Sequence, residues 1–123
     1  MLGRVLAAAV GCIAAVTVVS VALAEQRHYL PMKNPALVAK SYQRDLNNNG
    51  FKQRCWALGR YVVTCRGLTL TNDPTQPWHP WSTQIRKVSR TAAERRIWMD
   101  GKSLGKPSVD KNFVRLFRIS GWN

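Results

Sequence analysis

The residue types that carry acid–base or metal chemistry are scarce in this sequence of 123 residues. It contains two histidines, His28 and His79, and six Asp and Glu residues in all. A pair of imidazoles can cleave RNA by acid–base chemistry, but both histidines fall in irregular segments and no spacing brings them together. The sequence has no Gly-rich phosphate loop, Gly-x-Ser-x-Gly elbow or His-Glu-x-x-His metal motif. We therefore expect a protein that is not an enzyme and has no metal or cofactor.

Cationic and aromatic residues that could bind an anion gather around the segment 50–70. If this segment is a hairpin in which Cys55 faces Cys65, then Arg54 lies directly opposite Arg66. Like charges opposed across a ladder are unfavourable unless solvent screens them or an anion lies between them. One interpretation is a solvated face of a basic protein. The other is an anion site formed by four side chains on that face: Lys52, Arg54 and Arg66, with Trp56 as an apolar or stacking neighbour.

Two further tryptophans, Trp78 and Trp81, lie in the proline-rich segment 71–84. The spacing of its prolines favours polyproline II or turns and disfavours a helix. In polyproline II, residues three apart share a side, so both rings could anchor a partner. The alternative is that both fold back onto the core. His79, which lies between them, is expected at the surface.

The segment 50–70 itself predicts a β-hairpin, because it is rich in β-branched and aromatic residues and is interrupted at Gly59. A disulfide usually joins residues whose Cα atoms are about 4.4–6.8 Å apart, so linked strand residues lie nearly opposite each other. A bond between Cys55 and Cys65 leaves residues 59–61 as a three-residue loop. Alternation then places a second set of side chains toward the core: Phe51, Cys55, Ala57, Val63 and Cys65. The alternative is a pair of buried free thiols.

Helical patterns flank this hairpin. Asn34 and Pro35 suit the start of a helix over 35–48. The sequence Asn47-Asn48-Asn49-Gly50 would end this helix. The capping box Thr91-Ala92-Ala93-Glu94 predicts a short helix over 91–99. Residues 108–119 are ambiguous, but they place apolar and basic side chains on separate faces of a helix, which we favour over a strand.

The first 24 residues have the pattern of a signal peptide. Arg4 precedes an uncharged apolar or small run over 5–24, which ends in Ala22-Leu23-Ala24. An uncleaved membrane anchor is the alternative, since 20 such residues can span a bilayer. Both interpretations predict export to the periplasm or beyond, where the compartment is oxidising and a disulfide persists.

These patterns predict an α+β fold with one small domain over 25–123: a helix, a disulfide-linked hairpin and one or two further short helices. The formal net charge of +13 favours an anionic partner. We expect a binding protein for an anionic polymer, an anionic membrane surface or nucleic acid. The alternative is a small accessory subunit of an envelope-associated protein assembly.

Overall fold

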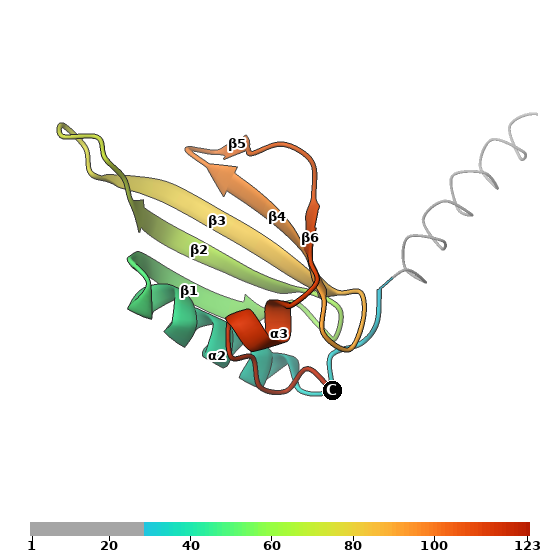
Figure 1. The fold of residues 1–123 in the computed structure, drawn as a ribbon. Coiled ribbons are helices and arrows are strands. Elements are labelled where there is room, and N and C mark those ends of the chain that lie inside the picture. Colours follow the sequence, from blue (N-terminus) through green and yellow to red (C-terminus); the bar gives the residue numbers. More distant parts are fainter. Residues whose placement is uncertain (1–28) are drawn as a thin grey trace, which may run out of the picture.

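The computed structural model describes residues 29–123, which form a six-stranded antiparallel sheet preceded by one long helix. Strands β1 to β5 follow one another across the sheet in chain order, and β6 pairs with the remaining part of β4. Figure 1 shows the long helix, α2, and the single turn α3 on the same side of this sheet. The elements are α2 (Pro35–Asn48), β1 (Phe51–Ala57), β2 (Val63–Leu70), β3 (Trp78–Lys87), β4 (Ala93–Met99), β5 (Lys102–Ser103), β6 (Ser108–Asp110) and α3 (Phe113–Leu116).

Helix α2 begins and ends where the sequence predicts. The Asn34 side chain accepts a hydrogen bond from the Leu37 N–H at 3.2 Å, and Pro35 occupies the first turn. Gly50 follows the helix with φ +90°, a conformation that glycine adopts without steric cost. The buried side chains of α2 lie against the sheet and are Val38, Ala39, Ser41, Tyr42 and Leu46.

The hairpin β1–β2 has the predicted register and the predicted disulfide. Cys55 faces Cys65 with Cα atoms 4.0 Å apart, and the two sulfur atoms are bonded. Arg54 faces Arg66. The Leu58 N–H donates to the Val62 carbonyl at 2.8 Å, which closes the loop over residues 59–61. A pairing constraint read from two cysteines was therefore enough to fix the register of these two strands.

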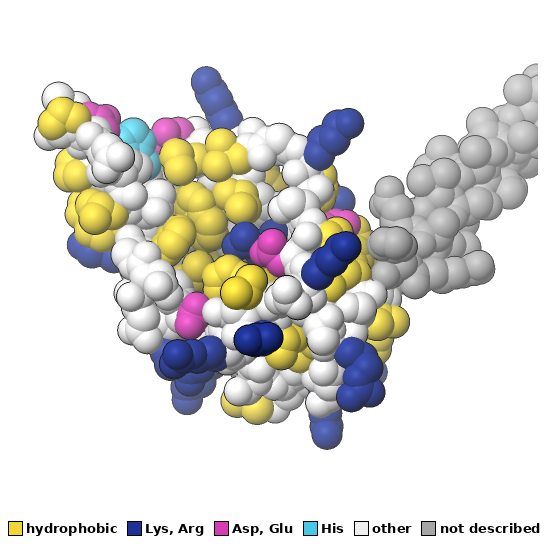
Figure 2. Space-filling model, in the orientation of Figure 1, with side chains coloured by type: hydrophobic (Ala, Val, Ile, Leu, Met, Phe, Trp, Pro, Cys, Tyr) yellow, Lys and Arg dark blue, Asp and Glu magenta, His cyan; other side chains and the backbone are white. Residues whose placement is uncertain are grey.

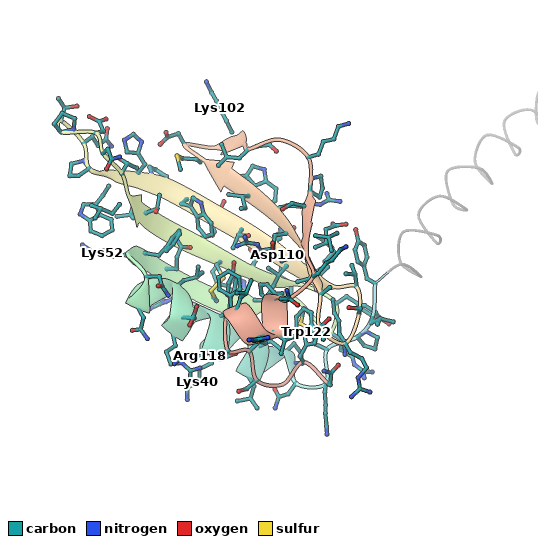
Figure 3. All side chains as sticks on the ribbon, in the orientation of Figure 1. Lys40, Lys52, Lys102, Asp110, Arg118 and Trp122 are labelled. Carbon is teal, nitrogen blue, oxygen red and sulfur yellow. A yellow bond between two sulfur atoms is a disulfide. The ribbon has the colours of Figure 1, made fainter. Side chains whose placement is uncertain are left out.

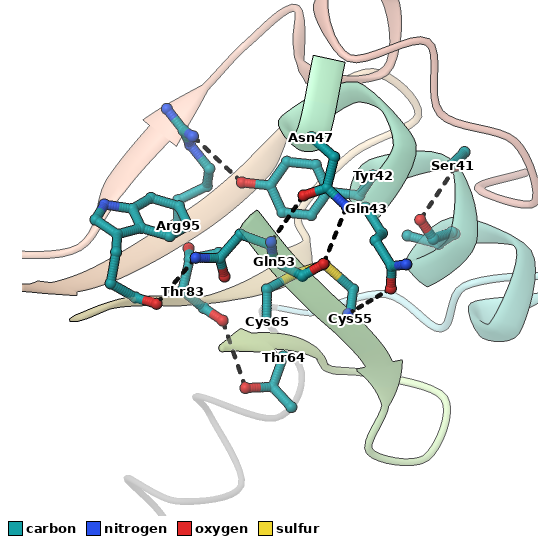
Figure 4. Close-up of a disulfide and its surroundings, with 12 residues drawn as sticks. Ser41, Tyr42, Gln43, Asn47, Gln53, Cys55, Thr64, Cys65, Thr83 and Arg95 are labelled. Atoms are coloured by element: carbon teal, nitrogen blue, oxygen red, sulfur yellow. Dashed lines mark hydrogen bonds between the residues drawn. A yellow bond between two sulfur atoms is a disulfide. The ribbon is translucent and has the colours of Figure 1, made fainter. Parts of the chain in front are cut away.

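The outer edge of β1 is closed by two side chains of α2. The Cys55 N–H donates to Oε1 of Gln43 at 2.8 Å, and the Gln53 N–H donates to Oδ1 of Asn47 at 2.7 Å (Figure 4). Unpaired edge N–H groups are sites where another strand can add. Because these two are already satisfied, the edge is a poor template for another strand.

The predicted helix over 91–99 is wrong, because this segment is strand β4. Its side chains alternate, and the ones that face the helices are Ala93, Arg95, Ile97 and Met99. Pairing with β3 along seven residues overrides the local capping pattern. Glu94 does not cap a helix; its carboxylate accepts a hydrogen bond from the Tyr29 hydroxyl at 2.9 Å.

The predicted helix over 108–119 is also wrong. Its first residues form β6 against β4, and only one turn, α3, is helical. Asp110 of β6 is 2.6 Å from Nε of Arg95, so the pair compensates two charges at the edge of the core. Phe113 is fully buried, with its ring 5.2 Å from that of Tyr42 and 5.3 Å from that of Trp122. The apolar residues of the tail thus fill the core beside α2 and do not form a basic amphipathic helix.

The predicted fold class is wrong in consequence. A single extended antiparallel sheet replaces the hairpin with several helices, because the segment 91–99 and the first residues of the segment 108–119 pair as strands. The segment 71–84 also differs from the prediction, since strand β3 begins at Trp78. The predicted signal peptide or anchor over residues 1–24 lies outside the described residues. Within residues 29–123, no helix is long and apolar enough to cross a membrane.

Candidate anion-binding face

The sheet has a helix face, covered by α2 and α3, and an open face that no helix of residues 29–123 covers. Strand alternation assigns every second residue of β1 to β4 to the open face. Five cationic residues and one acidic residue, Glu94, occupy these positions. The cations are Lys52, Arg54, Arg66, Arg86 and Arg96.

Five of the six predicted binding residues lie together on this face. The five are Lys52, Arg54, Trp56, Arg66 and Trp78. The ammonium group of Lys52 lies 4.0 Å from the ring centroid of Trp78. Figure 3 places Lys52 at the end of the sheet from which the connection between β2 and β3 projects. The predicted hairpin residues therefore share one face of the sheet, whereas the contact between Lys52 and Trp78 was not predicted from the sequence.

Trp81 is the exception. It belongs to the helix face, is 7% exposed and packs its ring 4.7 Å from that of Phe51. The predicted shared side for Trp78 and Trp81 is wrong, because residues three apart in a strand point to opposite faces. Trp81 thus takes the core role that the sequence left open.

Arg54 and Arg66 form a cationic pair at the centre of β1 and β2. They are exposed, directly opposed Cα partners, which in an antiparallel ladder lie about 5 Å apart. No carboxylate within residues 29–123 is within ion-pair distance of either guanidinium. The pair therefore repels itself in the free protein, and an anion placed between the two groups would relieve the repulsion.

A groove of about 420 Å³ runs across the open face beside this pair. Trp56 on β1 and Trp98 on β4 form its ends, and the floor between them carries the small or polar side chains Thr64, Ser82 and Gln84. A second hollow of about 350 Å³ adjoins it and shares four of its lining residues, Arg66, Ser82, Trp98 and Gly101. The two hollows thus meet beside a guanidinium that has no ion-pair partner.

Sequence reasoning missed Trp98 and Arg96, because both lie in the segment predicted as a helix. On a helix, Trp98 would have no fixed relation to Trp56. As part of β4 it pairs with Ser82, two strands away from the β1 edge. The alternation of Glu94, Arg96 and Trp98 is the signal that could have assigned them to one strand face.

Glu94, the one acidic residue of the open face, already has partners within the protein. Glu94 accepts from the Tyr29 hydroxyl at 2.9 Å and lies 3.5 Å from Nε of Arg96. The Arg86 guanidinium lies 5.6 Å from the Tyr29 ring centroid. Burial and the hydrogen bond to Glu94 raise the pKa of Tyr29. Glu94 thus compensates the charge of Arg96, whereas Arg54 and Arg66 have no carboxylate partner within residues 29–123.

His79 lies apart from this face, where the connection between β2 and β3 meets the turn after β4. Its Nδ1 is 3.0 Å from the Asp100 carboxylate, and its Nε2 is 3.2 Å from that of Asp73. The hydrogen bond to Asp100, followed by the one to Asp73, raises the pKa of His79. Hydrogen bonds from Thr75 lower the pKa of Asp73 to about 2. No cluster among residues 29–123 has the composition of a metal site, and His28 lies outside this range.

Comparison with protein-family models, curated proteins and solved structures gave no match to this chain. The case for a function therefore depends on the geometry of its own residues.

Proposed function

We propose that the protein is a non-enzymatic, exported binding protein that holds an anionic partner against the open face of its sheet. The observation that carries the proposal is the opposed pair Arg54 and Arg66, which is exposed and lacks a carboxylate partner within residues 29–123. Lys52 and Trp56 lie on the same face, so an anion there would meet further charge and an aromatic surface. The net charge of +13 draws such a partner from a distance.

The decisive experiment compares two double variants on an anionic resin. Heparin retention should fall steeply with salt for the wild type, because binding releases counterions. Arg54→Gln with Arg66→Gln should lower the eluting salt concentration more than Arg90→Gln with Arg115→Gln, which removes the same charge from exposed sites elsewhere. Equal shifts would reduce the pair to ordinary surface charge, and weak retention of the wild type at low salt would refute the proposal.

A second candidate function is an accessory subunit of an envelope-associated assembly. On the helix face, Leu116 of α3 is 64% exposed, and Figure 2 shows hydrophobic side chains gathered beside α3 over the sheet. Apolar surface of this kind is typical of protein interfaces. Co-purification of discrete protein partners that survive high salt would favour this function, whereas an anionic partner would dissociate.

A further inference from the structure

We infer that the anionic partner is a carboxylated glycan chain, which lies across the strands in the groove between Trp56 and Trp98. The inference rests on the proposed function and specifies the chemistry of the ligand. Four features of the open face carry it: the length of the groove, the chemistry of its floor, the type of its cations and the spacing of its rings.

The length of the groove suits several linked sugar rings. Neighbouring strands of a sheet lie about 4.8 Å apart, so β1 and β4 are separated by about 14 Å. Trp56 and Trp98 stand on these two strands, while the strands between them carry Thr64, Ser82 and Gln84 at the groove, together with the Arg66 side chain. Indole rings at both ends and mostly small or uncharged side chains between them leave a shallow trough that a linear chain can enter and leave, and the Arg66 side chain lines it. A single small anion would leave most of it empty.

The floor of the groove offers hydrogen-bonding groups suited to hydroxyl-rich rings. The Ser82 hydroxyl is half-buried and makes no hydrogen bond within residues 29–123. Gln84 uses its carbonyl oxygen to accept from Arg86 at 3.3 Å, which leaves its amide N–H groups to donate. A hydroxyl and an amide beside an indole can bind the polar rim of a sugar while the ring lies on the apolar surface of the tryptophan.

The type of cation points to carboxylates. The opposed pair consists of two arginines, whose planar guanidinium groups match a carboxylate through two parallel hydrogen bonds. Both guanidinium groups are exposed and have no acidic partner within residues 29–123. One carboxylate between Arg54 and Arg66 would satisfy donors on both and remove their repulsion.

The spacing of the rings disfavours nucleic acid. Proteins that bind single strands stack successive bases on aromatic side chains along a basic groove. Here the rings of Trp56 and Trp98 have two strands between them, and the third ring, Trp78, already has the Lys52 ammonium group on it. A membrane surface is also a poorer fit, because the groove is recessed and polar at its centre and a bilayer cannot fill it.

The test uses a galacturonate hexamer and its fully methyl-esterified form, which has the same length and no charge. By isothermal titration calorimetry, we expect the galacturonate hexamer to bind the protein at least tenfold more tightly than its methyl-esterified form does. A thymidylate hexamer and vesicles with one-third anionic phosphatidylglycerol should bind more weakly than the acid. Tighter binding of either, or equal binding of acid and ester, would overturn the inference.

Two tryptophan variants test where the glycan lies. Trp56→Ala and Trp98→Ala should each weaken hexamer binding at least fivefold, while Leu116→Ala on the helix face should leave it unchanged. If Trp98→Ala does not fold, amide NMR shifts of the wild type replace it, and they should cluster at Ser82 and Gln84 on titration. Shifts confined to the helix face would overturn the inference.

The same measurements separate this inference from the proposed function. If heparin retention depends on Arg54 and Arg66 but the hexamer does not bind, the glycan inference fails and the anion-binding face stands. If neither heparin nor the hexamer binds, both fail.

Discussion

The two faces of the sheet are built from the same four strands but have opposite chemistry. On the helix face, Val63, Cys65 and Ile85 are fully buried beneath α2 and α3. On the open face, Trp56 is 39% exposed, and two arginines face each other with no counterion among residues 29–123. The helix face buries the apolar core, whereas the opposed arginines of the open face repel each other. Aromatic and cationic residues on such a face are more readily explained by binding than by folding.

The largest expected effect separates the faces by stability. Phe113→Ala, on the helix face, should lower the free energy of unfolding by about 3–5 kcal/mol, because it removes a fully buried ring that contacts Tyr42 and Trp122. Trp56→Ala, on the open face, should lower it by less than about 1 kcal/mol. Urea denaturation measures both. A loss at Trp56 as large as that at Phe113 would mean that the open face belongs to the core.

The second effect concerns the covalent link between β1 and β2. Replacing both Cys55 and Cys65 with Ala should lower the free energy of unfolding by about 2–3 kcal/mol, because a short closed loop in the unfolded chain is released. Urea denaturation of the variant and of the wild type measures this loss. The wild type should lose a similar amount when reductant breaks the bond. No difference between oxidised and reduced wild type would show that the bond does not stabilise the fold. The register itself should persist in the folded variant, and backbone NMR would show whether Arg54 still faces Arg66.

A third, smaller effect has the opposite sign on the open face. Arg54→Gln should raise the free energy of unfolding by about 0.5 kcal/mol at low salt, because it removes a directly opposed like charge. The gain should vanish at high salt, where the repulsion is screened. Arg90→Gln, an exposed control away from the pair, should change little. A variant that is more stable and binds heparin less well would place the residue in a binding site, and a destabilised one would count against this assignment.

The sequence predicted those parts of this comparison that depend on local chemistry. Helix α2 follows from Asn34 and Gly50, and the register of β1 and β2 follows from Cys55 and Cys65. Strand β4 could not be predicted in this way. Arg95 faces the helices, where a charged residue is not expected from the sequence. Its ion pair with Asp110, from another strand, makes this position possible.

Some residues of the candidate site could likewise be placed from the sequence, and others could not. The hairpin placed four of its residues correctly, namely Lys52, Arg54, Trp56 and Arg66. Local alternation could have assigned Trp98 to a strand, but its place at the far end of the groove depends on the pairing of β3 with β4. Nonlocal pairing decides which distant residues share a face, and local propensity carries no information about it.

The smallest expected effect concerns His79, which lies near the start of β3 beside the connection over residues 71–77, and it depends on the pH. Its pKa is raised by Asp100 and Asp73, so its contribution to stability is complete below pH 6.5 and is lost as the pH rises through the folded-state pKa. The pKa of Asp73 is lowered to about 2, so its contribution is present above pH 3.8 and is lost as the pH falls through that lower value. The connection over residues 71–77 should therefore be held most firmly between about pH 4 and 6.5.

Amide hydrogen exchange measures this local effect, after correction for the intrinsic pH dependence of exchange. Protection at Thr75 and Gln76, whose N–H groups donate to Asp73, should be greater at pH 5.5 than at pH 8.5 in the wild type. In His79→Gln the difference should disappear, because the neutral amide does not titrate. Exchange at Cys65, in the centre of the sheet, should show no such difference in either protein. A pH-dependent change that survives in His79→Gln would assign the effect to another group and leave the two carboxylates as ordinary turn residues.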